Sequence, residues 1–470
     1  MAKGVVIPKP GKLNYSKVRA YRVILLLDVI SKLVECIAAH LIADHLERKR
    51  GLHEGQYGYR KRQSCVDAVA VLMSRTQQAW KEKRVAGALF MDVKSVFNNV
   101  SKAHLGRRME ALGVEPDLIR WTGSFMSDRQ VKLVLDSKVG EAKPVDTGIP
   151  QGSPAAPILF VTYPSGIFDE VEAAVPGVQG LSFVDDISWW AEGRDDEAVA
   201  ANLAAAATAA IEWAAENGVA FDHSKRETTL FHRKKLTPKV TVKVGDKTAP
   251  FSREATRWLG VWLDSQLSLK GHHAVRIKEG RKAKARLHRL TRQMGLSPAN
   301  CRKVMMACIQ SVAMFGSELW WKGEYVTGTK GQVEDLQLLV NQEARATTGC
   351  FQTTSLGALS MESGLRAAAT QLENRQRRFG LRLLSLPQGG QAQEVVGAPM
   401  AIGRQLTNPL AHRGQVESTV LLEEPETLDT VLIQEEEAEA KMEAEKTWPG
   451  LTMFTDGSRM EDGATGFAVA

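Results

Sequence analysis

The sequence has no stretch of uninterrupted apolar residues long enough to cross a membrane. A helical span needs roughly 20 such residues, and the most apolar early stretch, residues 23–29, is short and contains Asp28. The first ten residues, MAKGVVIPKP, also lack the apolar core of a secretory signal peptide. No membrane association is therefore expected, and a core strand or helix is the better interpretation of residues 23–29.

Cysteine is scarce and dispersed. The chain has five cysteines, at positions 36, 65, 301, 308 and 350, and no two of them form a CxxC pair. This spacing supports neither a disulfide framework nor a zinc module. It favours a reducing, intracellular setting, the nucleus or the cytoplasm. Internal repeats are also lacking.

What is present is an ordinary folded composition with an uneven charge. The 470 residues include 44% apolar and 24% charged residues, enough for large cores and more than one domain. The net charge of +7 hides an asymmetry, because residues 401–470 hold 5 Lys and Arg against 14 Asp and Glu. The first 400 residues hold 56 against 40. A region with this excess of Lys and Arg attracts a polyanion, and the attraction weakens with salt. The alternative is a protein with a basic surface that has no such partner.

Periodicity indicates a mixture of helices and strands. Helices are predicted near 31–46, 67–80, 102–125, 158–163 and 195–218, and strands near 87–93, 131–135, 181–190, 228–232 and 240–244. The second strand is predicted to belong to a hairpin that turns near Gly140. Pro164 and Gly166 predict a break after the helix that begins at Ile158. Residues 270–386 are predicted to be largely helical and are rich in Lys and Arg.

Two adjacent aspartates, Asp185 and Asp186, lie between two apolar segments. Their charges are costly there unless a cation compensates, and hard oxygen ligands suit Mg²⁺. Asp92 stands similarly at the end of an apolar run. Three carboxylates at neighbouring strand ends would hold two Mg²⁺ ions, which promote phosphoryl transfer by activating a 3′-hydroxyl and stabilising pyrophosphate. The alternative is a solvated hairpin turn, where Asp is common.

The order of motifs from about residue 5 to residue 385 resembles the reverse transcriptase domain of non-LTR (LINE-type) retrotransposons. The matching motifs are Met91-Asp92 followed by Val96-Phe97, then Pro150-Gln151-Gly152-Ser153-Pro154, Phe183-Val184-Asp185-Asp186, Asp222-His223-Ser224-Lys225 and Leu259-Gly260. Five motifs in the family's order make chance a poor explanation. The resemblance implies that Asp92, Asp185 and Asp186 are the catalytic and metal-binding residues, with Mg²⁺ as the cofactor.

The resemblance also assigns residues around the incoming nucleotide. Phe97 would lie beneath the sugar and exclude a 2′-hydroxyl by its bulk, unless it is an ordinary core residue. Gln151 and Gly152 would let the backbone approach the nascent base pair, since glycine permits close contact; a plain tight turn is the alternative. Lys9 and Arg22 resemble the residues that bind the triphosphate, a task suited to a point charge and a planar fork, or else they are solvated surface cations.

The two remaining assignments concern the later motifs. Lys225 would neutralise phosphate charge or pair with a carboxylate. Leu259 and Gly260 would form the primer grip. The implied fold is an α+β right-hand polymerase with fingers, palm and thumb, followed by a linker.

The predicted domains follow from these motifs. Residues 1–265 would form fingers and palm, 266–386 a helical thumb or connection, 387–450 an acidic linker, and 451–470 the start of a truncated ribonuclease H domain. The last assignment rests on the sequence around Met453-Phe454-Thr455-Asp456-Gly457-Ser458. No ribonuclease H activity is expected, because the chain stops before the family's other carboxylates.

The sequence departs from the family at several points. The fingers segment reads Tyr21-Arg22-Val23-Ile24-Leu25 where the family has Tyr-Arg-Pro-Ile-Ser, and Asn98 replaces a carboxylate after Phe97. No endonuclease domain is expected before the fingers. These departures suggest a truncated or decaying copy of an element.

The resulting prediction is an RNA-directed DNA polymerase, a nucleotidyltransferase that binds an RNA template, a DNA primer and deoxynucleoside triphosphates. The first alternative is a degenerate, inactive copy that only binds nucleic acid. The second is an RNA-templated RNA polymerase, which Phe97 argues against. Target site and oligomeric state do not follow from the sequence.

Overall fold

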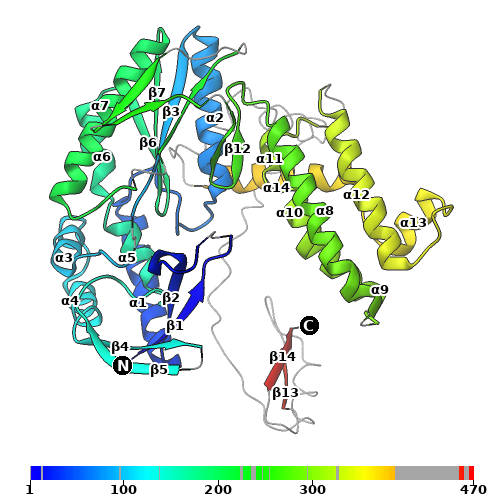
Figure 1. The fold of residues 1–470 in the computed structure, drawn as a ribbon, viewed down its shortest axis with the longest axis horizontal. Coiled ribbons are helices and arrows are strands. Elements are labelled where there is room, and N and C mark those ends of the chain that lie inside the picture. Colours follow the sequence, from blue (N-terminus) through cyan, green and yellow to red (C-terminus); the bar gives the residue numbers. More distant parts are fainter. Residues whose placement is uncertain are drawn as a thin grey trace, which may run out of the picture. The chain divides into compact units, whose positions relative to one another are not determined.

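The structure is a computed structural model with two compact units, Met1–Pro409 and Leu410–Ala470. It describes residues 2–11, 14–94, 97–136, 138–222, 226–233, 240–245, 247–252, 254–293, 295–323, 328–386, 455–459 and 465–469. Helices and strands are mixed along the first unit, as the predicted α+β class requires (Figure 1).

A four-stranded antiparallel sheet, here called the central sheet, has the strand order β6-β7-β3-β8. Its strands are β3 (Val85–Asp92), β6 (Val178–Phe183), β7 (Asp186–Gly193) and β8 (Glu227–Phe231). The two inner strands pair along their whole length, from Val85 opposite Gly193 to Asp92 opposite Asp186. The ends that carry the predicted aspartates therefore lie side by side.

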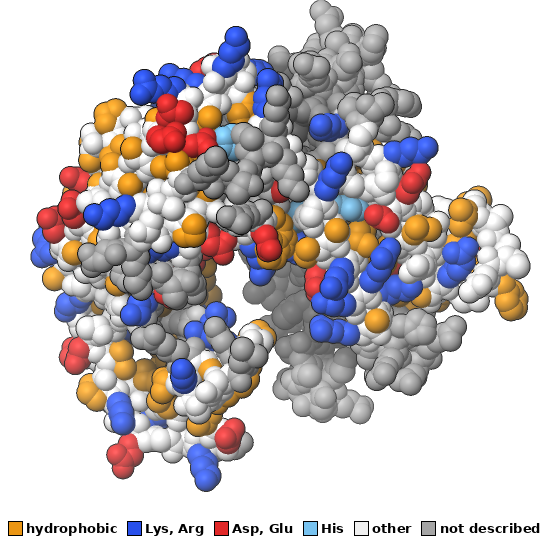
Figure 2. All heavy atoms as spheres, turned by 45° about the horizontal axis from the view of Figure 1, so that its top comes forward, with side chains coloured by type: hydrophobic (Ala, Val, Ile, Leu, Met, Phe, Trp, Pro, Cys, Tyr) orange, Lys and Arg blue, Asp and Glu red, His pale blue; other side chains and the backbone are white. Residues whose placement is uncertain are grey.

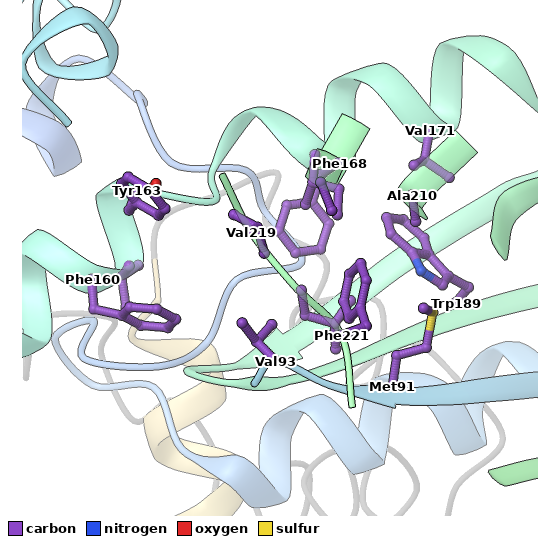
Figure 3. Packing of buried hydrophobic residues seen from close by; sticks show 14 of the residues in the cluster. Met91, Val93, Phe160, Tyr163, Phe168, Val171, Trp189, Ala210, Val219 and Phe221 are labelled. Atoms are coloured by element: carbon purple, nitrogen blue, oxygen red, sulfur yellow. The ribbon is translucent and has the colours of Figure 1, made fainter. Parts of the chain in front are cut away.

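Residues of one strand point alternately to opposite faces of the sheet. Both faces of the central sheet carry apolar side chains, and helices cover each face. Ala86, Ala88 and Phe90 belong to a core cluster shared with α2 (Cys65–Lys81) and the C-terminal helices. Met91 and Val93 belong to a second cluster, in which Figure 3 shows them close to Phe221 and Trp189. That second cluster also holds side chains of α5 (Ala156–Thr162), α6 (Gly166–Ala174) and α7 (Asp196–Glu216).

A second four-stranded sheet, the N-terminal sheet, has the order β2-β1-β4-β5. Its strands are β1 (Ala2–Pro8), β2 (Tyr21–Leu26), β4 (Arg129–Leu135) and β5 (Lys138–Val145), and the single turn η1 (Val18–Ala20) precedes β2. β1 pairs with β4 in parallel, although about 120 residues separate them. The helices α1 (Val29–Arg48), α3 (Lys102–Ala111) and α4 (Pro116–Phe125) complete this part.

Two small hairpins and a run of helices follow the central sheet. The hairpins are β9 (Thr241–Val244) with β10 (Lys247–Pro250), and β11 (Thr256–Trp258) with β12 (Val261–Leu263). The helical region then comprises α8 (Lys270–Gln293), α9 (Pro298–Val304), the π-helix η2 (Met305–Gln310), α10 (Ser311–Ala313), α11 (Ser317–Trp320), α12 (Lys330–Thr348), α13 (Leu356–Ser363) and α14 (Ala368–Leu384).

Several helix boundaries have local causes visible in the sequence. The Asp195 carboxylate accepts a hydrogen bond from the Ala198 backbone N–H at 2.8 Å and caps α7, and Gly218 takes a left-handed φ of 68° just after its end. The predicted break at Pro164 and Gly166 is confirmed, because α5 ends at Thr162 and α6 begins at Gly166. α7 is long and apolar enough to cross a membrane, but its apolar face packs in the second core cluster.

The predicted hairpin of β4 and β5 is confirmed, but Gly140 is not at its turn. Leu135 pairs with Lys138, so the two strands already face each other there and Gly140 lies inside β5. Asp136 adopts a φ of 49° there. Aspartate tolerates the left-handed region well, so the turn does not need glycine.

One surface of α1 is apolar and exposed. Ile30, Leu33, Ile37 and Leu41 are spaced along one side of the helix and are 78%, 61%, 62% and 49% exposed. Nothing in the described part of the chain covers this side. The fold thus presents a continuous apolar helix face outside its two cores.

In the second unit the structure describes one antiparallel hairpin, β13 (Thr455–Arg459) and β14 (Thr465–Val469). Asp456 lies in β13, opposite Ala468. The predicted acidic linker falls outside the described residues.

Candidate active site

The three predicted aspartates meet at one end of the central sheet. Asp92 ends β3, Asp186 begins β7, and Asp185 lies in the two-residue turn between β6 and β7. Asp92 and Asp186 are direct cross-strand partners, and Phe183 is the partner of Asp186 on the other side. Two residues 94 positions apart in the chain are therefore neighbours on one face of the sheet.

The hydrogen-bond pattern brings Asp92 and Asp186 especially close. The Val93 backbone N–H donates to the Asp185 carbonyl at 3.0 Å, so Asp92 and Asp186 form the adjacent pair without mutual backbone hydrogen bonds. Such pairs have Cα atoms about 4.5 Å apart, closer than the hydrogen-bonded pairs. Two carboxylates directly opposite each other repel. This repulsion favours binding of a cation between them.

A fourth carboxylate extends the row. The Asp222 backbone N–H donates to the Asp92 carbonyl at 2.8 Å, and Val93 forms a bridge with Phe221. Asp222 therefore lies opposite Asp92, on the side of β3 away from Asp186. Asp186, Asp92 and Asp222 thus lie next to one another on neighbouring segments of one sheet face. Asp222 belongs to one of the sequence motifs but had no predicted role, because the pairing between residues 92 and 222 leaves no local signal.

The turn that carries Asp185 is strained. Val184 has a φ of 63°, in the left-handed region that β-branched residues avoid. A positive φ at the first of two turn residues is the pattern of a type II′ hairpin, which normally uses glycine there. Such a conformation costs on the order of 1–3 kcal/mol and persists only where the surroundings impose it.

The surroundings of this turn are supplied by residues 55–59. The Ser182 N–H donates to the Gly55 carbonyl at 2.7 Å, and the Tyr57 N–H donates to the Ser182 carbonyl at 2.9 Å. A Cβ atom on Gly58 would lie 2.6 Å from the Val184 nitrogen, so glycine is needed for this approach. The segment thus packs along β6 and against the turn.

Tyr59 follows this segment and was not predicted to belong to the site. Burial raises the pKa of its hydroxyl, and the negative charge of Asp185 raises it further. Its phenol is therefore protonated at neutral pH and lies close enough to Asp185 for the two groups to interact electrostatically. Nothing in the sequence near Tyr59 indicates this, because the interaction joins segments more than 120 residues apart.

The donor atoms at this end of the sheet are those that Mg²⁺ prefers, namely carboxylate oxygens. All four aspartates are partly exposed, so an ion has access to them. Within the described ranges, however, no three His, Cys, Asp or Glu side chains are gathered as a group able to hold a metal ion. The backbone places Asp92 and Asp186 in position to bind a cation, while the side chains are not gathered into a group of metal ligands.

The loop with Gln151 and Gly152 joins the site to the N-terminal sheet. The Leu25 N–H donates to the Gln151 carbonyl at 2.7 Å, at the edge of β2. Gly152 has a φ of 119°, and a Cβ atom there would lie 2.5 Å from the Leu25 oxygen. Glycine is required at this position for both reasons. The Ser153 hydroxyl donates to the buried carboxylate of Glu35 in α1, which fixes the same loop from the other side.

Phe97 follows β3 and lies next to this loop. The Ile149 N–H donates to the Phe97 carbonyl at 2.5 Å. The ring is half-buried, 5.7 Å from that of Phe160 between centroids. One side of Phe97 thus rests on the second core cluster and part of it remains exposed.

The predicted triphosphate residues Lys9 and Arg22 lie on the N-terminal sheet. Arg22 pairs with Ile7, and the Lys9 N–H donates to the Ala20 carbonyl at 2.8 Å, so the two side chains share one face. Arg22 is exposed and Lys9 is half-buried. Lys225 lies outside the described residues.

Leu259 and Gly260 form the turn of the β11–β12 hairpin. Their φ values of 47° and 81° are both positive, as in a type I′ turn. The base of the hairpin packs on the sheet, because the Trp258 ring is 5.3 Å from that of Phe90, two residues before Asp92 on the same face. The predicted primer grip therefore lies on the side of the sheet that carries Asp92 and Asp186.

Helix α8 holds this hairpin. The Arg276 guanidinium donates to the Gly260 carbonyl at 2.8 Å. The Trp262 N–H donates to Nδ1 of His272 at 3.3 Å, and Nε2 of His272 faces the Phe315 carbonyl at 2.8 Å. A ring that accepts at Nδ1 is neutral and donates from Nε2. His272 is fully buried, and burial lowers its pKa from 6.5 to about 4.

Because of this histidine, we expect the free energy of unfolding to fall in acid. Its folded pKa is depressed, so the unfolded chain takes up the proton first as the pH falls from 6.5 toward about 4. The contribution of His272 to the free energy of unfolding is fully present above pH 6.5. As the pH falls through this window, the free energy of unfolding decreases by about 3 kcal/mol. We expect urea unfolding at pH 7.5 and pH 4.5 to differ less in His272→Gln, which keeps a donor and an acceptor. An equal pH dependence in both proteins would contradict this role.

Comparisons with known proteins show which sequences this chain is similar to. The family described as reverse transcriptase (RNA-dependent DNA polymerase) matches residues 7–263. The chain is 24% identical over 395 residues to a probable RNA-directed DNA polymerase from transposon BS of Drosophila melanogaster, covering 82% of this chain and 42% of that protein. It is 26% identical over 349 residues to the probable polymerase from transposon X-element of the same fly, covering 73% and 37%.

The other similarities are weaker. The RNA-directed DNA polymerase from mobile element jockey of Drosophila funebris is 24% identical over 274 residues, covering 57% of this chain and 29% of that protein. A solved apo telomerase from Candida tropicalis has a TM-score of 0.43 at 12% identity, covering 88% of this chain and 67% of that chain. The chain spans less than half the length of the transposon polymerases that it matches.

Proposed function

Because the chain belongs to the reverse transcriptase family, which matches residues 7–263, we propose that it adds deoxynucleotides to a primer 3′ end on an RNA template. The observation that carries this proposal is the cross-strand pair of Asp92 and Asp186, with Asp185 in the adjoining turn. The names of the similar polymerases support origin from a non-LTR retrotransposon.

Asp92, Asp185 and Asp186 would hold Mg²⁺, because they place hard oxygen donors together at a partly exposed sheet end. When bound, Mg²⁺ activates the 3′-hydroxyl and stabilises the charge of the leaving pyrophosphate. Lys9 and Arg22 would bind the triphosphate from one face of the N-terminal sheet. The Gln151–Gly152 loop would support the nascent base pair, and Lys225 would neutralise phosphate charge.

The same proposal assigns roles to the parts of the chain. Residues 1–265 would serve as fingers and palm and 266–386 as the thumb. Leu259 and Gly260 would position the primer end, since their hairpin packs through Trp258 on the strand that ends in Asp92. The β13–β14 hairpin would correspond to the start of a ribonuclease H domain.

Primer extension tests the proposal. The full chain is incubated with poly(rA)/oligo(dT), dTTP and Mg²⁺, and the products are resolved by length. We expect elongated oligo(dT) that depends on Mg²⁺ and disappears with EDTA. Absence of extension by a folded chain that still binds the primer–template would overturn it.

One alternative function has its own support. Asn98 replaces a carboxylate next to Phe97, and the aspartate side chains do not form a closed set of metal ligands within the described residues. Both observations favour a degenerate copy that binds nucleic acid without polymerising. Binding without extension in the assay above would establish this alternative.

Phe97 is expected to select deoxynucleotides. Its ring is half-buried beside the Gln151–Gly152 loop, so a smaller side chain opens space there without exposing much of the core. Phe97→Val should raise the efficiency of ribonucleotide incorporation relative to deoxynucleotides by about 10- to 100-fold, the range for a steric difference of one small group. Single-nucleotide incorporation of dTTP and UTP measures the ratio.

Phe160→Leu is the matched control, because Phe160 packs against Phe97 but is buried. It should lower stability without changing the ratio. If Phe97→Val loses stability and leaves the ratio unchanged, Phe97 is an ordinary core residue.

A further inference from the structure

The helical region contains a large pocket lined by arginines, which we call the arginine pocket. Its volume is about 830 Å³, and it lies between α9, η2, α11 and α14. Five of its lining residues are arginines, at positions 302, 366, 375, 378 and 382, and one is a glutamate, at position 318. None of them belongs to the motifs that identify the polymerase site.

Two of these arginines are already neutralised. Arg382 binds the buried carboxylate of Asp67 through both of its terminal nitrogens, at 2.6 and 2.5 Å. The Arg375 guanidinium lies 3.7 Å from Glu318. The other three arginines, Arg302, Arg366 and Arg378, have no ion pair with a carboxylate in the described part of the chain. Three uncompensated guanidinium groups around one cavity attract an anion with several charges.

A glycine shapes the wall of the pocket. Gly364 has a φ of 63°, and a Cβ atom there would collide with the Arg302 guanidinium. Arg302 therefore lies directly over the backbone of residue 364. A planar guanidinium placed in this way presents several donors in a fixed geometry, which suits phosphate oxygens.

The remaining lining residues suit a base and a sugar. Met306 is 51% exposed and provides an apolar surface, whereas Leu365 and Phe379 are buried. The Asn374 side-chain amide adds donors and an acceptor beside it, and the Gln371 amide already donates to the Arg366 carbonyl at 2.8 Å. Met306 belongs to the π-helix η2, a deviation from α-helix that often accompanies functional sites. A phosphate chain with an unstacked base matches this combination better than a duplex, whose bases are covered.

The pocket is distinct from the basic side of α8. There Lys278, Arg281, Lys282 and Arg286 are exposed, and Figure 2 shows Lys and Arg side chains distributed over the helical region. None of these four residues lines the arginine pocket. A duplex backbone needs an extended basic surface, which α8 offers, whereas a partly open pocket of this size suits a single nucleotide with its flanking phosphates.

We propose that the arginine pocket binds single-stranded RNA, with phosphates on Arg302, Arg366 and Arg378 and a base against Met306. The choice of RNA rests on the proposed function, because an RNA-templated polymerase works on a chain with a single-stranded portion outside the active site. The amide of Asn374 supplies the partners that a 2′-hydroxyl requires.

Fluorescence anisotropy with the full chain tests the proposal. The polymerase site is first saturated with an unlabelled primer–template ending in a dideoxynucleotide. A labelled, unstructured 12-nucleotide RNA or a DNA of the same sequence is then titrated at several salt concentrations. Arg366→Gln/Arg378→Gln should weaken RNA binding at least ten-fold and lower the salt slope by about 0.7 for each phosphate that the variant no longer neutralises.

Arg377→Gln is the matched control. Arg377 is a neighbour of Arg378 on α14, carries the same charge and pairs with Glu373 at 3.0 Å, but does not line the pocket. It should leave RNA affinity unchanged. Crosslinking of a 4-thiouridine RNA should map to peptides containing Met306 and should disappear in the double variant.

Three results would overturn the proposal: unchanged RNA affinity in the double variant, equal losses in the double variant and Arg377→Gln, or DNA bound as tightly as RNA. Displacement of the RNA by an acidic peptide at lower concentration than by RNA would instead indicate a protein partner. Primer extension by the wild-type chain is measured separately. If the wild-type chain does not extend primers but still binds RNA at the pocket, the polymerase function is refuted and the RNA site is not.

Discussion

Asp186→Asn is expected to abolish primer extension while the protein still folds and binds the primer–template. Asp186 and Asp92 face each other across β7 and β3. An amide keeps the size of the side chain but removes a charge and a hard anionic ligand. Loss of metal-based stabilisation amounts to several kcal/mol, so the extension rate should fall by about a thousand-fold or more. Asp92→Asn should have the same effect.

Two further aspartates make the measurement specific. Asp117 in α4 is exposed and belongs to no part of the site, so Asp117→Asn should extend primers at the wild-type rate. Asp222 is opposite Asp92 on its other side, and Asp222→Asn should reduce extension less than Asp186→Asn because Asp222 is not among the predicted metal ligands. Extension by Asp186→Asn at the rate of Asp117→Asn would refute the assignment of the active site.

Arg382→Leu is expected to lower the free energy of unfolding by about 3 kcal/mol. The Asp67 side chain is fully buried and the Arg382 side chain is 29% exposed, and the pair joins α14 to the first turn of α2. Removing Arg382 leaves a buried carboxylate without its partner. The same guanidinium also donates to the Arg62 carbonyl at 2.7 Å, which loses its donor as well. Urea unfolding followed by tryptophan fluorescence measures the change.

A double variant separates the ion pair from packing. Asp67→Leu/Arg382→Leu removes both charges and should be more stable than Arg382→Leu alone, since no buried charge is left unpaired. Arg377→Gln, which changes an exposed pair on the same helix, should alter stability by less than about 1 kcal/mol. If Arg382→Leu is as stable as Arg377→Gln, the connection between α14 and α2 does not depend on this pair. Hydrogen exchange of the amides in α2 and α14 should increase in Arg382→Leu.

The elements of the central sheet and the aspartates at its end were accessible from the sequence because their signals are local. An apolar run that ends in Asp92, and two apolar strands that meet at Asp185 and Asp186, are patterns within ten residues. The break at Pro164 is similarly local, and the structure confirms it. The turn of the β4–β5 hairpin was expected near Gly140, but Asp136, just after β4, provides the left-handed backbone for which glycine was assumed.

The contributions of Tyr59 and Asp222 have no local signal. Tyr59 approaches Asp185 because residues 55–58 pack along β6, and Asp222 stands beside Asp92 because the chain after α7 returns to the edge of β3. The arginine pocket likewise collects residues from four separate helices. Such groupings depend on which segments pack together. The burial of apolar side chains in the two core clusters decides this packing, and the residues next to Tyr59 or Asp222 in the sequence do not.

The sequence by itself determined the chemistry of this protein: the carboxylates, the glycine at position 152 and the order of the motifs. It could do so because a turn, a strand end or a ligand type is encoded within a few residues. The tertiary structure alone decided that Asp92 and Asp186 are direct cross-strand partners, that Trp258 brings the Leu259–Gly260 turn to the same face, and that Arg382 closes α14 on Asp67. These pairings join residues tens to hundreds of positions apart, and only the register of the sheet and the packing of the cores select them.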